Sequence, residues 1–138
     1  MSDPIRYTPD TIYTYVRNAV KAVYSSAYTT SKYEPTPSSF PCVMVRTIGQ
    51  IRPTSGIQLD FADKQIRYTV EIQVFSNKKG SSQSQANAVM DVVSTAMNDL
   101  YFIQDMREPV DNADATISRV IARFHRIVGG GDAIEERS

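Results

Sequence analysis

The stretch that decides the fold runs over residues 66–128, where the hydrophobic period changes twice. It reads IRYTVEIQVFS over 66–76, SSQSQANAVMDVVSTAMNDLY over 81–101 and ATISRVIARFHRIV over 115–128. The first and last segments alternate apolar and polar residues, as half-buried strands do. The middle segment repeats its apolar residues every three or four positions, as an amphipathic helix does. Two long strands that flank one helix predict a sheet with a helix packed on it.

Upstream of that stretch the sequence predicts a further helix and shorter strands. A Thr-Pro-Asp start, followed by apolar residues at helical spacing as far as Val23, indicates a helix over 9–24. A Ser- and Pro-rich loop is expected over 25–40, with a short strand around 27–30. A buried strand is expected over 42–47.

Local signals define the two ends of the helix at 81–101. Ser82 and Gln85 match the S-x-x-Q capping box, in which the two side chains bond the first backbone amides of a helix. Residues 102–110 are expected to return as a strand that Pro109 breaks, because proline cannot donate to a sheet.

These elements add up to one α+β domain over 1–128, with its core over 40–128 and the N-terminal helix over 9–24. The expected sheet is mainly antiparallel but mixed, with about four to five strands and two helices packed on one face. The tail over 129–138 begins with three glycines and is expected to be flexible.

Composition narrows the class of protein. The chain has 138 residues, and its 15 Lys and Arg balance its 15 Asp and Glu, so no overall field attracts it to DNA or to anionic lipid. No apolar run approaches the roughly 20 residues of a membrane span, and the start lacks the pattern of a signal peptide. We therefore expect assembly in the cytoplasm and no membrane. The single Cys42 is expected to be buried.

Little in the sequence indicates catalysis. His125 is the only histidine, and no local motif supplies it with an orienting acid or a nucleophile. Asp111, Asn112 and Asp114 lack the glycine and the distal glutamate of a calcium loop, and a turn is expected there instead. We expect no enzymatic activity, no catalytic residue, no cofactor and no metal.

The chemistry that stands out belongs to surfaces. Arg119, Arg123 and His125 alternate along one face of the last strand, where they could pair with Glu71 and Asp60 of the same sheet, pair with those of another copy, or contact phosphates. The residues expected at contacts between subunits are Tyr28, Tyr33, Arg46, Asp60, Glu71, Arg119, Arg123 and His125.

Tyrosines and long loops indicate partner surfaces in the first half of the chain. Six of the eight tyrosines fall within the first 33 residues, where they either face a partner or pack on the protein's own sheet. The segments 25–40 and 47–64, with a loop over 48–56 and a hairpin arm at 57–61, are expected to reach over a neighbouring subunit and to order on assembly.

Four quoted segments carry a resemblance. The chain reads FPCVMVR over 40–46, YTVEIQVFSN over 68–77, MNDLYF over 97–102 and TISRVIARFHRIV over 116–128. Over about 40–128 it resembles the small phage tail-terminator proteins, also called tail-completion or head–tail joining proteins. Relatives commonly end the helix with Leu-Gly-aromatic, whereas Tyr101 stands at the glycine position here.

The resemblance implies a function in the virion. Such proteins close into a ring, expected to be a hexamer, on top of the tail tube, where the ring stops tube polymerisation. The partners it implies are copies of the same chain, the tail tube protein, and the head–tail connector or head-closure protein. DNA would pass through the ring without specific binding. The expected location is the tail or neck of the virion, after assembly in the host cytoplasm.

Two alternatives come from other classes. One is a different neck component, such as a head-closure protein, or a minor capsid protein. The other is a small nucleic-acid-binding module that uses Arg119, Arg123 and Arg126.

Overall fold

The computed structural model describes residues 9–32, 34, 37–51, 65–111 and 114–129, which form two helices and five strands. The elements are, in chain order, α1 (Pro9–Val23), β1 (Tyr28–Thr30), β2 (Cys42–Ile51), β3 (Gln65–Ser76), α2 (Ser82–Asp99), β4 (Ile103–Val110) and β5 (Ser118–Gly129). The described strands make one sheet in the order β1-β2-β3-β5-β4, in which β1 pairs with β2 in parallel and the other neighbours pair antiparallel.

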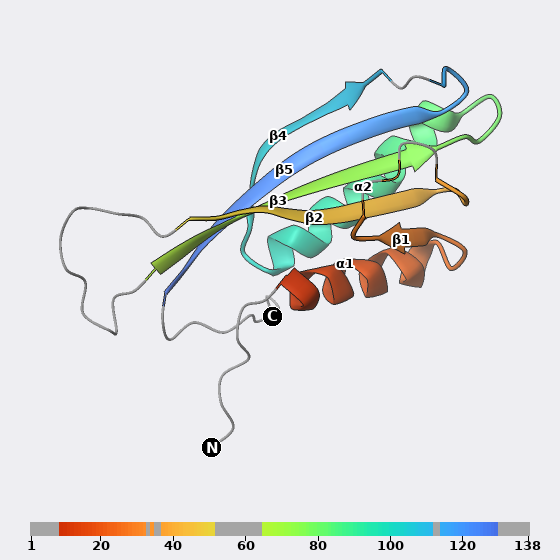
Figure 1. Cartoon of the computed structure of the whole chain (residues 1–138). Coiled ribbons are helices and arrows are strands. Elements are labelled where there is room, and N and C mark those ends of the chain that lie inside the picture. The colour runs from red at the N-terminus through yellow and green to blue at the C-terminus, as the bar shows by residue number, and fades with distance from the viewer. Residues whose placement is uncertain (1–8, 33, 35–36, 52–64, 112–113, 130–138) are drawn as a thin grey trace.

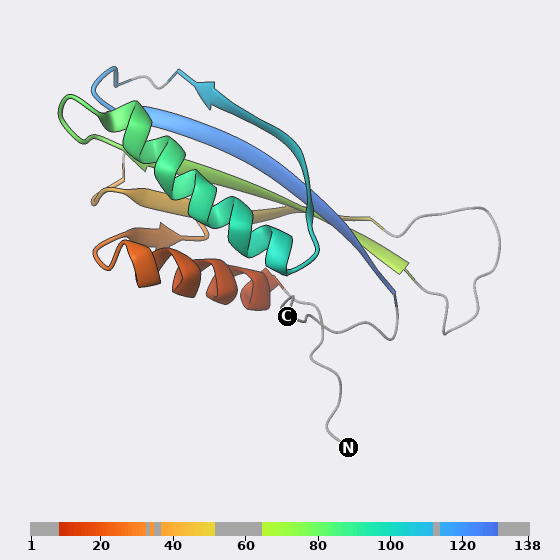
Figure 2. The ribbon, with the colours of Figure 1, turned by 180° about the vertical axis from the view of Figure 1, so that it is seen from behind.

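Both helices lie side by side on one face of this sheet (Figure 1 and Figure 2). This arrangement confirms the predicted α+β fold class, with a mixed sheet and two helices on one face. Neither helix, within the described part of the chain, combines the length and the apolarity that crossing a membrane requires.

The main core lies between the helices and the sheet, and the two hydrophobic periods account for it. Alternation sends every second residue of β3 and β5 under the helices, and the helical spacing turns one stripe of each helix toward the strands. The fully buried members include Val16 of α1, Ile72 of β3, Met90 of α2 and Val120 of β5. Val23 was expected on this stripe, but it lies at the end of α1 with 61% of its surface exposed.

Two strand boundaries differ from the predictions. β2 continues to Ile51, where a loop was expected from residue 48, and a register shift between Thr47 and Gly49 accommodates the irregular sequence. β4 continues through Pro109, because β4 is the outermost strand and a proline there need not interrupt a ladder on both sides. The arm predicted at 57–61 lies outside the described residues.

The predicted capping box at the start of α2 is wrong. Ser81 occupies the N-cap position and makes no capping bond with its side chain. The Ser82 hydroxyl instead lies 2.6 Å from the hydroxyl of Ser118 at the start of β5, and the Gln85 carbonyl oxygen accepts a bond from the Ser76 hydroxyl at the end of β3. Both side chains therefore tie the helix to the neighbouring strand ends.

The end of α2 adopts a Schellman turn at a non-glycine residue. The Tyr101 amide donates to the Asn98 carbonyl at 2.9 Å, and the Phe102 amide donates to the Met97 carbonyl at 3.0 Å. This pair of bonds requires a left-handed backbone at the residue that directly follows the helix cap. Tyr101 occupies that position and has φ +64°. Arg126 of β5 closes the same end, because its Nη1 donates to the Leu100 carbonyl at 2.9 Å.

A second, smaller cluster lies on the opposite face of the sheet. It consists of the buried residues Cys42, Met44, Phe75 and Ile117, flanked by the half-buried Tyr28 and Phe40. Burial, together with the negative charge of Glu34, raises the pKa of the Cys42 thiol from 9.0 to about 12.

Replacing Tyr101 by glycine should stabilise the protein. The left-handed backbone costs an L-residue about 1–2 kcal/mol, partly offset by the greater freedom of glycine in the unfolded chain, so Tyr101→Gly should raise the free energy of unfolding by roughly 0.5–1 kcal/mol. Urea denaturation measures this. Tyr101→Phe keeps the strain and the ring, so it should leave the midpoint unchanged; a gain from Tyr101→Phe of the same size would contradict the explanation.

The thiol of Cys42 should report on the integrity of the fold. Between pH 9.0 and about 12, the Cys42 thiol stays protonated in the folded protein, whereas the same thiol loses its proton in the unfolded chain. Its contribution to stability is therefore complete below pH 9 and lost as the pH rises toward 12. The native protein should not react with a thiol reagent such as dithionitrobenzoate at pH 8, and it should react at once in urea. Cys42→Ala should flatten the alkaline decline; rapid labelling without denaturant would contradict the burial.

Candidate inter-subunit surface on the open sheet face

Strand pairing aligns three charged residues on the face of the sheet that is turned away from the helices. We call this face the open face. Alternation along the central strand β3 places Glu71 on this face, between the core residues Val70 and Ile72 on the other. The register aligns Glu71 with Arg46 of β2 on one side and with Arg123 of β5 on the other. A carboxylate thus lies between two guanidinium groups contributed by three adjacent strands.

Glu71 is almost fully buried, with 5% of its surface exposed, and side chains of the open face bind its carboxylate. Arg123 donates from Nε at 3.2 Å and from Nη2 at 3.1 Å to Oε1. Nη2 of Arg46 lies 3.7 Å from Oε2, to which Gln73 donates from Nε2 at 3.1 Å. These contacts compensate for the loss of water around a buried carboxylate.

Two further predicted residues lie on the same face with partners of their own. The guanidinium of Arg119 lies 5.7 Å from the ring centroid of Phe75, its cross-strand neighbour. Nδ1 of His125 lies 2.6 Å from Oδ1 of Asp105. Asp105 occupies the register shift of β4 between Gln104 and Met106, and such a bulge re-aims a side chain.

The structure therefore brings together three of the eight predicted contact residues, Arg46, Glu71 and Arg123, in one ion-pair row within the chain. Tyr28 lies apart from them, on the edge strand β1, where its hydroxyl donates to Oε2 of Glu34 at 2.6 Å. That bond raises the pKa of Tyr28. The other two predicted residues, Tyr33 and Asp60, lie outside the described residues.

Three of the N-terminal tyrosines pack on the protein's own core. Tyr13, Tyr15 and Tyr24 are half-buried against the main cluster. The Tyr13 hydroxyl donates to Oγ1 of Thr29, which joins α1 to β1 at 3.1 Å. These rings therefore hold the first helix on the sheet, which was the alternative to a partner surface.

Sequence reasoning missed an exposed apolar group at the end of β4 and β5. It consists of Tyr101, Ile103 and Ile127, which are 44%, 60% and 49% exposed. Together with His125 and Arg126 they line a hollow of about 360 Å³. The alternation placed Ile127 on the face of His125, but no sequence signal showed that β4 would leave this end of the face uncovered.

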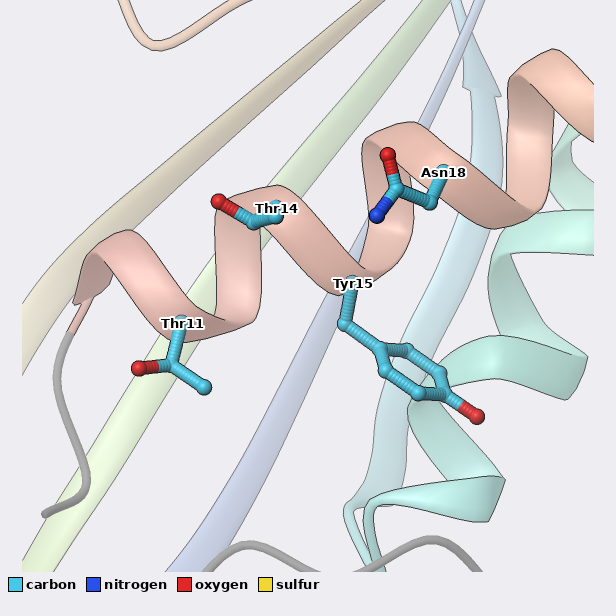
Figure 3. Close-up of a pocket in the computed structure, with 4 residues that line it drawn as sticks. All are labelled: Thr11, Thr14, Tyr15 and Asn18. Carbon is cyan, nitrogen blue, oxygen red and sulfur yellow. The ribbon is translucent and has the colours of Figure 1, made fainter. Parts of the chain in front are cut away.

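A second hollow, of about 390 Å³, lies over α1 (Figure 3). Thr11, Thr14, Tyr15 and Asn18 line it, one turn apart along the helix, and Figure 3 shows the Tyr15 ring turned toward α2. These four side chains offer hydroxyl and amide groups. In the part of the chain that the structure describes, no three His, Cys, Asp or Glu side chains lie close enough to hold a metal ion.

Removing the carboxylate of the ion-pair row should cost more than removing one arginine. Glu71→Gln should lower the free energy of unfolding by about 2 kcal/mol, because two arginines lose their common partner on a crowded face. Arg123→Gln should cost less than about 1 kcal/mol, since the side chain of Arg123 is half exposed and Glu71 keeps two other partners. Urea denaturation of both variants measures the difference, and equal losses would contradict the asymmetry.

No protein-family model and no curated protein sequence matches the chain. The inference about function therefore depends on the open face, on the arrangement of the strands and on the sequence segments that carry the resemblance.

Proposed function

We propose that this chain is a structural subunit of a phage virion: a tail terminator whose copies close into a ring on the tail tube, end its polymerisation and dock the tail to the head connector. The observation that carries the proposal is the open face. The helices cover one side of the sheet, and the other side presents a row of fixed, opposite charges, Arg46, Glu71 and Arg123, beside apolar residues. Such a rigid, mixed surface suits contact with another protein.

A closed ring also requires that the edge strands of one subunit do not pair with those of other chains. Edge strands invite pairing with other chains, and both edges of this sheet carry features that discourage it. β1 is only three residues long, and β4 contains Pro109, a register shift and charged side chains. Contacts between copies would therefore use side chains of one surface against a different surface of the next copy, as a closed ring demands.

The geometry of the resembling segments agrees with the proposal. Three of the quoted segments correspond largely to β2, β3 and β5, and the fourth covers the end of α2. Relatives commonly carry glycine at the position of Tyr101, and the left-handed backbone there is the conformation that glycine adopts without strain. The departure from the family pattern therefore changes the residue while the turn keeps the geometry that suits glycine.

The nucleic-acid alternative is less well supported. Arg119 and Arg123 are engaged on the open face by Phe75 and Glu71, whereas Arg126 bonds the Leu100 carbonyl at the end of α2. The three arginines do not form one continuous basic ridge. A different neck component, such as a head-closure protein, remains the alternative that the experiment below must separate.

Particles made without this protein should have tails of uncontrolled length when viewed by negative-stain electron microscopy. That is the expected result for a terminator, because nothing then stops tube polymerisation. Tails of normal length beside heads that have lost their DNA would instead indicate a head-closure protein. Native mass spectrometry of the purified protein with tail tubes should also show multiples of the 15.4 kDa subunit.

Matched variants can link this phenotype to the open face. Arg67 is exposed and lies on the open face by its alternation with Thr69 and Glu71, whereas Arg17 is exposed on α1. Supplying Arg17→Glu to the deficient particles should restore tails of normal length, and Arg67→Glu should not, although both variants should keep the wild-type circular dichroism spectrum. Full rescue by Arg67→Glu would argue against a role for this end of the face.

A further inference from the structure

Basic and apolar side chains are exposed together at one end of the open face. Arg67 of β3 lies opposite Ile127 of β5, and both side chains are exposed. On the same face, Arg123 of β5 has half of its side chain exposed, and Ile103 at the start of β4 is exposed as well. We call these four residues the basic patch. It offers positive charge beside apolar surface, so an acidic and partly apolar partner would complement it.

Acidic side chains are exposed at the other end of β4. Glu108 lies opposite Ile121, which alternates with the open-face arginines of β5, so Glu108 is on the open face as well. Asp111 directly follows the strand and is exposed. The half-buried Val110 stands between the two acids in the sequence and, with Asp111 and Ile117, lines a hollow of about 440 Å³. We call Glu108, Val110 and Asp111 the acidic patch.

The charges of the two patches are largely unpaired within the chain. In the part that the structure describes, the side chains of Arg67, Glu108 and Asp111 make no ion pair and no hydrogen bond. Arg123 is bound to Glu71, but half of its side chain faces solvent. These groups are therefore available to another molecule.

The neighbouring charges of opposite sign are engaged elsewhere. Asp105, near the start of β4, is bound by the only histidine of the chain at 2.6 Å. Arg119, at the start of β5, has its guanidinium 5.7 Å from the ring centroid of Phe75. Lys78 and Lys79 precede α2, which covers the other face of the sheet. The two ends of the open face therefore present opposite charge.

One copy cannot bring its own two patches together. Ile103 and Val110 are the first and last residues of the eight-residue strand β4. At about 3.3 Å per residue, the strand holds them roughly 20 Å apart. An ion pair requires its charged atoms to lie within about 4 Å of each other. The patches can therefore meet only between two copies.

We propose that the acidic patch of one copy packs on the basic patch of the next copy in the ring. Glu108 and Asp111 then face Arg67, and Val110 lies against the exposed isoleucines of the basic patch. The contact uses side chains only, since Pro109 and the register shift keep β4 from accepting a further strand. The inference rests on the proposed function, because it names the surface that meets the open face there.

The occupant is a second copy because the chain itself supplies both halves of the contact. Its 15 basic and 15 acidic residues cancel overall, yet the open face separates the two signs between its ends. Each copy would present its basic patch to one neighbour and its acidic patch to the other, so the contact repeats until the ring closes. The tail predicted over 129–138 lies, apart from Gly129, outside the described residues, and neither patch includes it.

Mixing two charge-reversed variants tests the contact. Arg67→Glu makes both patches of a copy negative, and Glu108→Arg makes both more positive, so each variant alone should repel its own copies. Each should lower the assembled fraction on the order of tenfold, because like charges then face each other. An equimolar mixture should restore it to within about twofold of wild type, with the two variants alternating. Sedimentation velocity measures the assembled fraction, and native mass spectrometry measures the composition.

Two controls separate the contact from a general effect of charge. The double variant Arg67→Glu/Glu108→Arg exchanges the two signs and should assemble with itself. Arg17→Glu makes the same change of charge on α1 and should assemble as wild type does. Mixed with Glu108→Arg, it should leave the Glu108→Arg copies outside closed rings. Circular dichroism checks that every variant is folded.

Three results would overturn the contact: a mixture that assembles no better than either variant alone, assembly that stops at dimers, and wild-type protein that stays at 15.4 kDa with and without tail tubes. The proposed function is judged separately. Tails of uncontrolled length that the mixture fails to correct would leave the terminator function standing without this contact. Tails of normal length in particles without the protein, together with restored assembly in the mixture, would leave the contact standing without the terminator function.

Discussion

The central strand β3 is the constraint on which the rest of the structure depends. It pairs with β2 on one side and with β5 on the other along most of its length. Tyr68, Val70, Ile72 and Val74 lie in the core beneath the helices, and the odd-numbered residues between Arg67 and Phe75 form the open face. A shift of one residue would place Glu71 among the core valines and expose Ile72. The alternation in β3 therefore fixes the register of its neighbours and the side on which the helices pack.

Burial of Glu71 is the cost of that arrangement, and the neighbouring strands offset it. A carboxylate that is 5% exposed requires partners, and they come from β2, β5 and β3 itself. The two arginines are much more exposed than the acid, so each keeps water on one side of its guanidinium. The ion-pair row therefore holds the two guanidinium groups in place with their exposed sides pointing away from the sheet. A partner that contacts the open face would meet these positive groups.

Sequence reasoning succeeded where the periodicity was long. The apolar stripe of α2 and the alternation in β3 and β5 each extend over ten or more residues, and these elements appear as predicted. It failed where contacts with distant parts of the chain competed with a local sequence signal. Ser82 and Gln85 match a capping box, but the ends of β5 and β3 supply other partners for their side chains. β2 continues past Thr47 because β3 pairs with it there, and the sequence of β2 alone does not contain that information.

The candidate surface was predictable only in part, for a related reason. The types of residue were visible in the sequence, but their grouping depends on the register across three strands. Arg46, Glu71 and Arg123 are separated by 25 and 52 positions along the chain, and they meet only because β2, β3 and β5 are adjacent. The exposed group around Ile103 depends instead on where β4 begins, which is set by the turn at Tyr101.

The twelve-residue ladder between β3 and β5 also has a mechanical consequence. Its hydrogen bonds lie perpendicular to the strands, so a force along β5 loads all of them in shear and must break them together. β2 and β4 flank this pair and would share the load. A force across the sheet would instead peel the bonds off one at a time, beginning at an edge. The subunit should therefore be stiff when stretched along its strands and weak when pulled sideways.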